Sequence, residues 1–410
     1  MQRSLRTIAV SLASIVAIAS SIACSEDKNT AGTGGNGGSS GDGGSPYANN
    51  GEGVCPGTVR PANDDFCQGT CLHDASGTCN NSSGRPVDSC CVLVGEPGKA
   101  QTAHYLERTT DTKEYADPSG AEPNLKCFDP ANYPQKPAAG ADQKTASLSG
   151  VIKAFANGGC LDTDLIGVTM EVYKVKRTGD PATDGALGDL VGSQLVVDAN
   201  MEIEMEQVTN CNDDPRPNRK YEYPSVPMYT ELLIKTYGDG WQPLYTYNVY
   251  ISEEDPDYDA TSNSYHYDVR ALAADDFNTI PTVAIGQTIT PGNGAIGGEV
   301  HDCDNIRLQN ARVDISLPRK GLVYFNSDED DPLPEQSRQN IGTGRTALYS
   351  ALDIKVDGSD GTFARVAGTG VIPDGNGGDK LVSLGYYDVR VFPNAISAVS
   401  LRGLRPFQVP

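Results

Sequence analysis

His104 and Glu107 have residue types and a spacing that could hold a metal ion. A His-x-x-Glu pair can present two ligands to one Zn²⁺, and catalytic zinc sites take three protein ligands. The third ligand would have to come from His266 or His301, far along the sequence. In an acid-rich chain with 4 His, one such match is unsurprising. We therefore predict that His104 and Glu107 are solvated loop or strand-edge residues, and metallopeptidase activity is the least favoured function.

Other catalytic patterns are also missing from the sequence. No Gly-x-Ser-x-Gly elbow lies on a strand–turn–helix pattern, as a hydrolase nucleophile requires. The glycine pairs Gly292/Gly294 and Gly297/Gly298 lack the P-loop Lys and the following helix of a phosphate site. We predict no catalytic residue, no cofactor-binding residue and no cofactor.

Two acidic segments, 252–259 and 327–331, offer the hard oxygen ligands that Ca²⁺ prefers. Neither segment has EF-hand spacing, and runs of like charge are usually solvated loops. Weak Ca²⁺ binding is therefore left open, and no metal-ligand set is assigned.

The first residues have the order of a secretory leader. Arg3 and Arg6 precede an apolar and small-residue run from Thr7 to Ala23, which ends at Cys24. This run is shorter than the roughly 20 residues that span a bilayer comfortably. The sequence Ser-Ile-Ala-Cys at 21–24 resembles a bacterial lipobox, which implies lipidation of Cys24 and a membrane anchor. Ordinary cleavage after residue 19 or 23, giving a soluble exported protein, is the alternative.

The residues after Cys24 are expected to form a tether. The stretch to about Gly53 is rich in Gly, Ser, Asn and Thr and has almost no apolar residues, so it cannot bury enough surface to order itself. A coil of this length has a mean span of about 30 Å. Ser25 resembles the residue that sorts Gram-negative lipoproteins to the outer membrane, so we expect an exported, outer-membrane-anchored protein, facing outward or inward.

The chain is strongly acidic, with a formal net charge of −22. Phosphate contacts need Lys and Arg, so this charge argues against a nucleic-acid partner. It suits a self-repelling surface protein.

Two segments of the chain share one strand pattern. Val168, Met170 and Val172 alternate with more polar residues, as in a half-buried strand. Laying Leu148 on Ile296, Gly150 on Gly298 and Leu165 on Leu308 superimposes this alternating set on Ala311, Val313 and Ile315. Two units of about 100 residues imply two tandem β-sandwiches.

The order Gly-x-Val, acidic loop, Leu-x-x-Ala-x-Val-x-Ile, Asp-Gly-x-Phe, Tyr-x-Val-x-Val resembles carboxypeptidase regulatory-like domains, which are prealbumin-like sandwiches. The resemblance covers most of 295–410 and, in 147–251, the first two strands and the last pair. It implies a module that supports, spaces or binds.

The expected fold is all-β, with two tandem prealbumin-like or Ig-like β-sandwiches after a small disulfide-rich region and a disordered tether. The expected organisation is: signal peptide 1–23, lipidated tether 24–53, Cys-rich region 54–128, linker 129–146, first sandwich 147–251, connector 252–294 and second sandwich 295–410.

The 11 Cys fit this layout. With Cys24 lipidated, ten remain, and all of these can pair after export. A zinc cluster at Cys67, Cys71 and His73 is the less favoured alternative for the Cys-rich region. Within the first sandwich, Cys160 and Cys211 lie in polar loops and are predicted to pair. The second sandwich holds only Cys303, so its partner must lie outside the repeat. The predicted partner is Cys127.

Aromatic residues gather between Tyr221 and Tyr250 and include Trp241. On a strand, Tyr245 and Tyr247 share one face. Exposed rings could stack on sugars or anchor a protein partner, but packing within the sandwich is the favoured interpretation.

The favoured function is a non-enzymatic envelope lipoprotein that acts as a spacer or protein-binding module, with envelope proteins or glycans as partners. The alternative is a carbohydrate- or calcium-dependent adhesion module.

Overall fold

The computed structural model describes most of the chain after residue 104. The described ranges are 104–109, 122–128, 132–135, 137–138, 140–155, 165–180, 182–206, 216–328, 332–338, 341–373, 379–403 and 405–408, with the short strands β1 Thr58–Val59, β2 Cys71–His73, β3 Cys79–Asn81 and β4 Val92–Leu93. Cys24 and the expected signal peptide and tether, 1–53, lie outside these residues. So do most of the Cys-rich region and the loops that carry Cys160 and Cys211.

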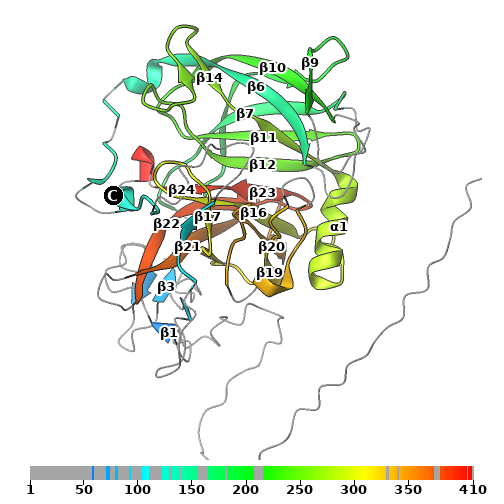
Figure 1. Cartoon of the computed structure of the whole chain (residues 1–410). Coiled ribbons are helices and arrows are strands. Elements are labelled where there is room, and N and C mark those ends of the chain that lie inside the picture. The colour runs from blue at the N-terminus through cyan, green and yellow to red at the C-terminus, as the bar shows by residue number, and fades with distance from the viewer. Residues whose placement is uncertain are drawn as a thin grey trace, which may run out of the picture. The chain divides into compact units, whose positions relative to one another are not determined.

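The described residues are mostly β-strand, and the predicted all-β fold with two sandwiches is confirmed (Figure 1). Among them there is one α-helix, α1 Ala274–Ile285. The strands before α1 are β5 Glu107–Arg108, β6 Thr145–Phe155, β7 Thr169–Val175, β8 Leu187–Val196, β9 Ile203–Glu206, β10 Arg216–Pro227, β11 Leu232–Gly238, β12 Trp241–Val249, β13 Tyr258–Asp259, β14 Ser264–His266 and β15 Val269–Ala273. Those after it are β16 Gly294–His301, β17 Leu308–Gln309, β18 Arg312–Ile315, β19 Gly321–Tyr324, β20 Leu348–Ile354, β21 Thr362–Pro373, β22 Asp379–Val391, β23 Ile396–Val399 and β24 Leu401–Arg402.

The two sandwiches have the same strand pairing. In the first, β6 pairs antiparallel with β10 and parallel with β14 and β15, while β7 pairs with β11 and β11 with β12. In the second, β16 pairs antiparallel with β20 and parallel with β23 and β24, while β18 pairs with β21 and β21 with β22. The repeat predicted from the sequence is therefore a repeat of topology as well as of residue pattern.

Two glycines mark equivalent places in this repeat. A β-carbon added to Gly150 in β6 would lie 2.4 Å from the carbonyl oxygen of Tyr267. One added to Gly298 in β16 would lie 1.8 Å from the carbonyl oxygen of Val399. At Gly150 the link between β14 and β15 passes directly over the glycine, and at Gly298 the parallel strand β23 does, so only a residue without a side chain fits.

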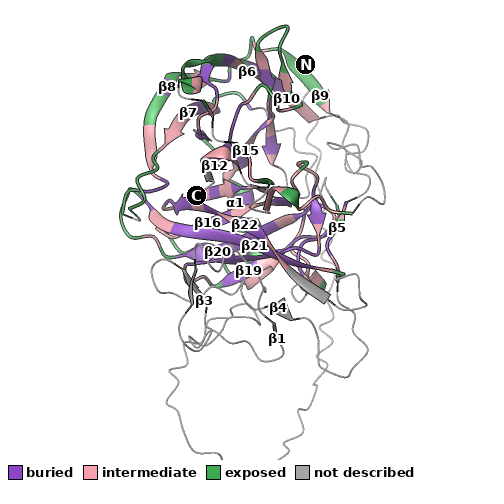
Figure 2. Ribbon diagram, turned by 90° about the vertical axis from the view of Figure 1, so that its left-hand side faces the viewer, coloured by how far each residue is buried: buried purple, intermediate pink, exposed green. Residues whose placement is uncertain are grey.

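The sandwiches share a continuous sheet. β12 of the first pairs parallel with β23 of the second, which gives the order β7-β11-β12-β23-β16-β20-β19 through both units (Figure 1). β8 pairs with β7 at the first end of this order. The first core lies on one face of β7, β11 and β12. Leu233, Tyr245 and Tyr247 point to the other face and join the core of the second sandwich. Apart from the edge strand β8, which is largely exposed, the strands of this shared sheet are buried along much of their length (Figure 2).

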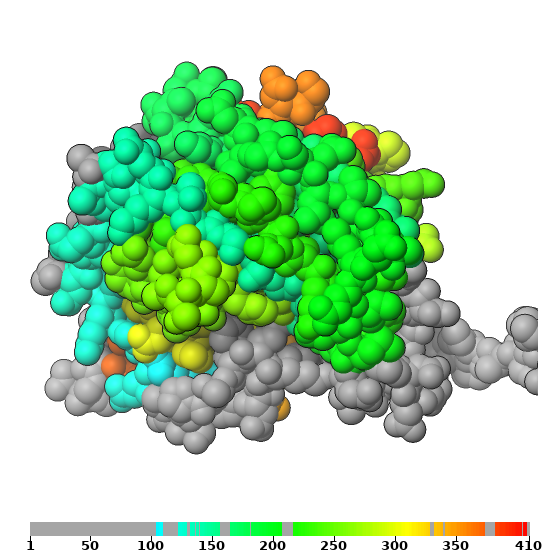
Figure 3. Space-filling view, turned by 90° about the horizontal axis from the view of Figure 1, so that it is seen from above, coloured from blue at the N-terminus to red at the C-terminus, as the bar shows by residue number. Residues whose placement is uncertain are grey.

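The expected connector at 252–294 is largely structured. β14 and β15 lie within it and complete the first sandwich beside β6, and α1 follows. In the space-filling view of Figure 3, the yellow-green residues of this segment lie against cyan residues near the start of β6. The first sandwich thus extends from Thr145 to Ala273 rather than ending at 251. These strands are short, which gave the sequence pattern little periodicity to detect.

Candidate functional site

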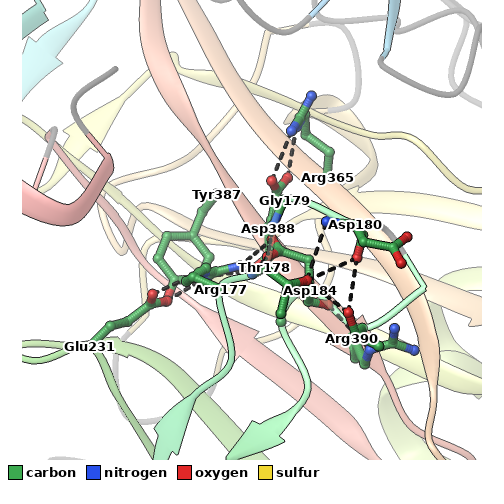
Figure 4. Close-up of polar contacts among 12 residues, drawn as sticks. Arg177, Thr178, Gly179, Asp180, Asp184, Glu231, Arg365, Tyr387, Asp388 and Arg390 are labelled. Atoms are coloured by element: carbon green, nitrogen blue, oxygen red, sulfur yellow. Dashed lines mark hydrogen bonds and ion pairs between the residues drawn. The ribbon is translucent and has the colours of Figure 1, made fainter.

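A network of charged residues lies where the two sandwiches meet (Figure 4). Its centre is Arg177, two residues after β7. The Arg177 guanidinium donates to Glu231 Oε2 at 2.7 Å, to Asp184 Oδ2 at 3.0 Å and to the carbonyl oxygen of Asp388 at 2.9 Å. Glu231 precedes β11 of the first sandwich, whereas Asp388 is in β22 of the second. One side chain therefore bonds to both units.

Tyr387 of β22 closes the network from the second sandwich. Its ring lies under the guanidinium of Arg177, 5.1 Å from ring centroid to Cζ, and its hydroxyl donates to Glu231. The backbone N–H of Asn248 donates to the same hydroxyl at 3.1 Å. Burial raises the pKa of Tyr387 well above its ordinary value, so the phenol remains a donor at physiological pH.

A second set of contacts extends the interface along β22. Tyr247 of β12 donates its hydroxyl hydrogen to the carbonyl oxygen of Gly185 at 2.8 Å and accepts from the backbone N–H of Arg390 at 3.2 Å. The guanidinium of Arg390 donates to the carbonyl oxygens of Gly361 at 2.7 Å and Asp184 at 3.2 Å. Both sandwiches thus supply donors and acceptors to one buried interface.

Ion pairs link this network to both sandwiches. Arg177 binds the carboxylates of Asp184 and Glu231, and Arg365 binds Asp388 through two contacts of 2.7 and 2.8 Å. The Glu231 side chain is buried and that of Arg177 is 29% exposed, so removing Glu231 or Asp184 leaves Arg177 with fewer partners at a partly solvated position. The arrangement holds the sandwiches in one orientation. It presents no nucleophile paired with a general base.

A second set of contacts, which we call the clamp, fastens residues 108, 124 and 127 to the loop after β16. A disulfide joins Cys127 to Cys303, the pair that the sequence analysis predicted. The backbone N–H of Cys303 donates to the carbonyl oxygen of Asn124 at 2.9 Å. The carboxylate of Asp302 accepts from Arg108 Nε at 2.6 Å and from the backbone N–H of Asn124 at 2.9 Å. The end of the Cys-rich region is therefore fixed to the second sandwich.

The candidate zinc pair has the environment predicted for it. His104 is exposed, and Glu107 lies exposed in β5, where Gln309 donates to its carboxylate. His301 is completely buried and directs Nε2 to Glu299 at 2.7 Å and Nδ1 to the carbonyl oxygen of Asn305 at 3.0 Å. In the described part of the chain, no group of three or more His, Cys, Asp or Glu is arranged to hold a metal ion.

The acidic segment 252–259 is bound by basic side chains of the protein itself. Glu253 forms an ion pair with Lys144 at 2.8 Å, and Asp255 lies 3.9 Å from Arg405 near the C-terminus. Asp255 also accepts from Tyr265 at 3.2 Å. These contacts engage the Glu253 carboxylate and one oxygen of Asp255 within the protein itself. In the other acidic segment, residues 329–331 lie outside the described part of the chain.

The aromatic residues that could have formed a sugar-binding surface are buried. Trp241, Tyr245, Tyr247 and Tyr250 are between 2% and 9% exposed. Tyr245 stacks on Phe392 of the second sandwich with ring centroids 4.0 Å apart. The favoured interpretation, that these rings pack within and between sandwiches, agrees with this burial.

The inter-sandwich network could not be found from spacing. Glu231 lies 54 residues from Arg177 and 156 residues from Tyr387. Only the pairing of β12 with β23 brings these positions together.

Comparison with protein-family models gives no match, and comparison with curated proteins finds no significant similarity. Among the described residues, no helix is long and apolar enough to cross a membrane.

Proposed function

We propose that this protein is a non-enzymatic lipoprotein of the cell envelope, in which two sandwiches act together as a rigid surface spacer or protein-binding module. The observation that carries the proposal is the interface between the sandwiches. A shared sheet and a network of ion pairs and hydrogen bonds around Arg177 join them, and these contacts leave little freedom for one unit to move against the other. Rigidity of this kind suits presentation of a surface at a fixed geometry.

The proposed attachment is through the N-terminus. Lipidated Cys24 would anchor the chain in the outer membrane, and the tether to residue 53 would span about 30 Å as a flexible coil. The disulfide between Cys127 and Cys303 would then attach the anchored N-terminal part of the chain to the second sandwich. The net charge of −22 supports an envelope surface role and disfavours nucleic-acid partners.

Anchoring is tested by metabolic labelling with an alkyne fatty acid in the native host. We expect the wild-type protein to carry the label and to fractionate with membranes, and the Cys24→Ala variant to lose both. Equal membrane recovery and no label in the wild type would contradict lipidation.

The binding role is tested by chemical cross-linking in intact cells, followed by purification of the protein and mass spectrometry. A reproducible partner linked through residues 150–410 supports a protein-binding module. The Cys24→Ala variant, displaced from the membrane, serves as the control and should lose an envelope partner. Recovery of abundant envelope proteins alone, equally in both, would contradict specific binding.

A further inference from the structure

Lys153, Asp268 and Glu206 meet on the sheet that begins the first sandwich. Lys153 lies in β6, Asp268 comes directly before β15, and Glu206 is the last residue of β9. The Nζ of Lys153 is 2.8 Å from Asp268 Oδ2 and 3.9 Å from Glu206 Oε1. The Lys153 side chain is only 11% exposed, so the ammonium is largely withdrawn from water.

Both carboxyl groups are oriented by other contacts. The backbone N–H of Val151 donates to Asp268 Oδ1 at 3.1 Å, and His266 Nε2 lies 3.4 Å from the same oxygen, which leaves Oδ2 to the lysine. Asn218, 1% exposed, donates Nδ2 to Glu206 Oε2 at 3.1 Å and leaves Oε1 facing the lysine. The three groups therefore have fixed roles in the contact.

We propose that Lys153 and Asp268 condense to an intramolecular amide, with Glu206 as the group that carries the proton. Proton transfer from the ammonium to the Asp268 carboxylate gives a neutral amine and a neutral acid, the two forms from which the amide bond is made. The Nζ lone pair attacks Cγ of Asp268. Glu206 takes the second proton from the nitrogen and returns it to the departing hydroxyl, so one water leaves and no oxidant or reductant is needed.

The fixed positions of Lys153 and Asp268 would accelerate amide formation. Two groups fixed within contact distance react as an intramolecular pair, with effective concentrations far above those in solution. General acid–base assistance by a neighbouring carboxyl typically adds about 10²- to 10⁴-fold. Glu206 Oε1 lies 3.9 Å from the reacting nitrogen, so its side chain must move closer to take the proton.

The proposed amide would join the first and last strands of the first sandwich. β6 is the first strand of the first sandwich and β15 is its last, and the two are parallel neighbours with Lys153 opposite Arg270. An amide between Lys153 and Asp268 would tie these strands covalently. The first sandwich would then resist unfolding by pulling or proteolysis, whether or not the protein has the function proposed above.

A second lysine–aspartate pair lacks these features and serves as a matched control. Lys320 Nζ is 2.5 Å from Asp353 Oδ2, but the Lys320 side chain is 47% exposed. The Asp353 carboxylate also accepts from Gln287, Thr290 and Asn293. These donors hold it ionised, and an ionised carboxylate is a poor electrophile. We expect no amide there.

The test is tryptic peptide mapping of the full-length exported protein after reduction. We expect segments 145–174 and 236–270 to be recovered as one species, lighter than their sum by one water, because trypsin does not cut after an acylated Lys153. Cleavage after Lys320 should proceed normally. Complete cleavage after Lys153, with free 145–153 peptide, would overturn the proposal.

Two variants separate the bond from the ion pair. Lys153→Arg keeps the charge and should abolish the linked species while the protein still folds. Glu206→Gln keeps an acceptor for Asn218 and should reduce the linked fraction at least tenfold. Undiminished linkage in Glu206→Gln would overturn the role assigned to Glu206.

Discussion

Tyr221 and Tyr349 make the same hydrogen bond in the two sandwiches. Tyr221 donates its phenolic hydrogen to the carbonyl oxygen of Tyr267 at 2.6 Å, and Tyr349 donates to that of Val399 at 2.8 Å. Each tyrosine comes from the strand on the antiparallel side of the first strand of its sandwich and reaches across to the parallel side. The two units therefore share a detail of side-chain chemistry as well as their topology, and in both the tyrosine crosses at a glycine.

The first prediction concerns that glycine in the second sandwich. Gly298→Ala should destabilise the protein by about 3 kcal/mol or more, because the new methyl group would overlap the carbonyl oxygen of Val399 at 1.8 Å and force the backbone to move. Gly297→Ala is the matched control, since its β-carbon would meet its nearest neighbour at an ordinary 3.5 Å. Chemical denaturation measures both. Similar loss in the two variants would contradict this account of the close approach.

The second prediction concerns the network between the sandwiches. Glu231→Gln should lower the free energy of unfolding by about 1–2 kcal/mol, because Glu231 is 5% exposed and its loss removes the closest partner of Arg177, which is 29% exposed and keeps Asp184. Glu202→Gln, which removes an exposed partner of Lys220, should have a much smaller effect, because water and salt screen exposed ion pairs. Thermal unfolding with a probe in each sandwich would also report coupling: the Glu231 variant should separate the two transitions. An effect no larger than that of Glu202→Gln would contradict the proposed role.

The sequence was informative where local patterns decide structure. Alternation at Val168, Met170 and Val172 identified β7, which begins one residue after Val168, and all three side chains are fully buried. The pairing of Cys127 with Cys303 followed from the position of Cys303 outside any pair within its own repeat. The number of cysteines left to pair and the alternation of apolar residues along a strand can both be read directly from a sequence.

What the sequence could not predict depends on contacts between distant segments. β14 and β15 are short strands whose stability comes from the parallel side of β6, and parallel pairing is a non-local choice. Arg177, Glu231 and Tyr387 each look like ordinary strand-end or strand residues. Their roles appear only when β12 pairs with β23 and brings the two sandwiches together.

The third prediction concerns the clamp. Replacing both Cys127 and Cys303 by Ser should lower the free energy of unfolding by about 3–4 kcal/mol, because the disulfide closes a long loop across a separation of 176 residues. The hydrogen bonds from Arg108 and Asn124 to Asp302 should hold the folded structure together at low denaturant. Denaturation of the double variant measures the effect. An unchanged midpoint in the double variant would mean that the polar contacts alone fix this segment.

The fourth prediction concerns the cysteines outside the described residues. β6 ends at Phe155, β9 ends at Glu206 and β10 begins at Arg216, and β10 pairs with both β6 and β9. The loops that carry Cys160 and Cys211 therefore leave the same end of one sheet. Peptide mapping without reduction should recover a Cys160–Cys211 link. A Cys160–Cys303 link would contradict both this pairing and the clamp.

The last prediction concerns acid stability and Glu299. Burial alone would raise the pKa of Glu299, but the charge of Arg307 and the hydrogen bond from His301 outweigh it and hold that pKa well below its usual range. The unfolded chain therefore binds this proton more readily than the folded protein. The stabilisation by Glu299 is present above its unfolded pKa of about 4.3 and is lost as the pH falls below that value.

The Glu299→Gln variant tests this argument. It should be less stable than the wild type at pH 7, where the wild type has an ionised Glu299, and the difference should shrink as the pH is lowered from about 5. Glu222→Gln removes an exposed carboxyl from the neighbouring sandwich and serves as the control. Urea denaturation at a series of pH values gives the free energy of unfolding for each protein. If the Glu299 and Glu222 variants lose stability in parallel with the wild type at every pH, the acid sensitivity must come from other carboxylates. The buried contact of Glu299 with Arg307 would then contribute to the fold through packing rather than through its charge.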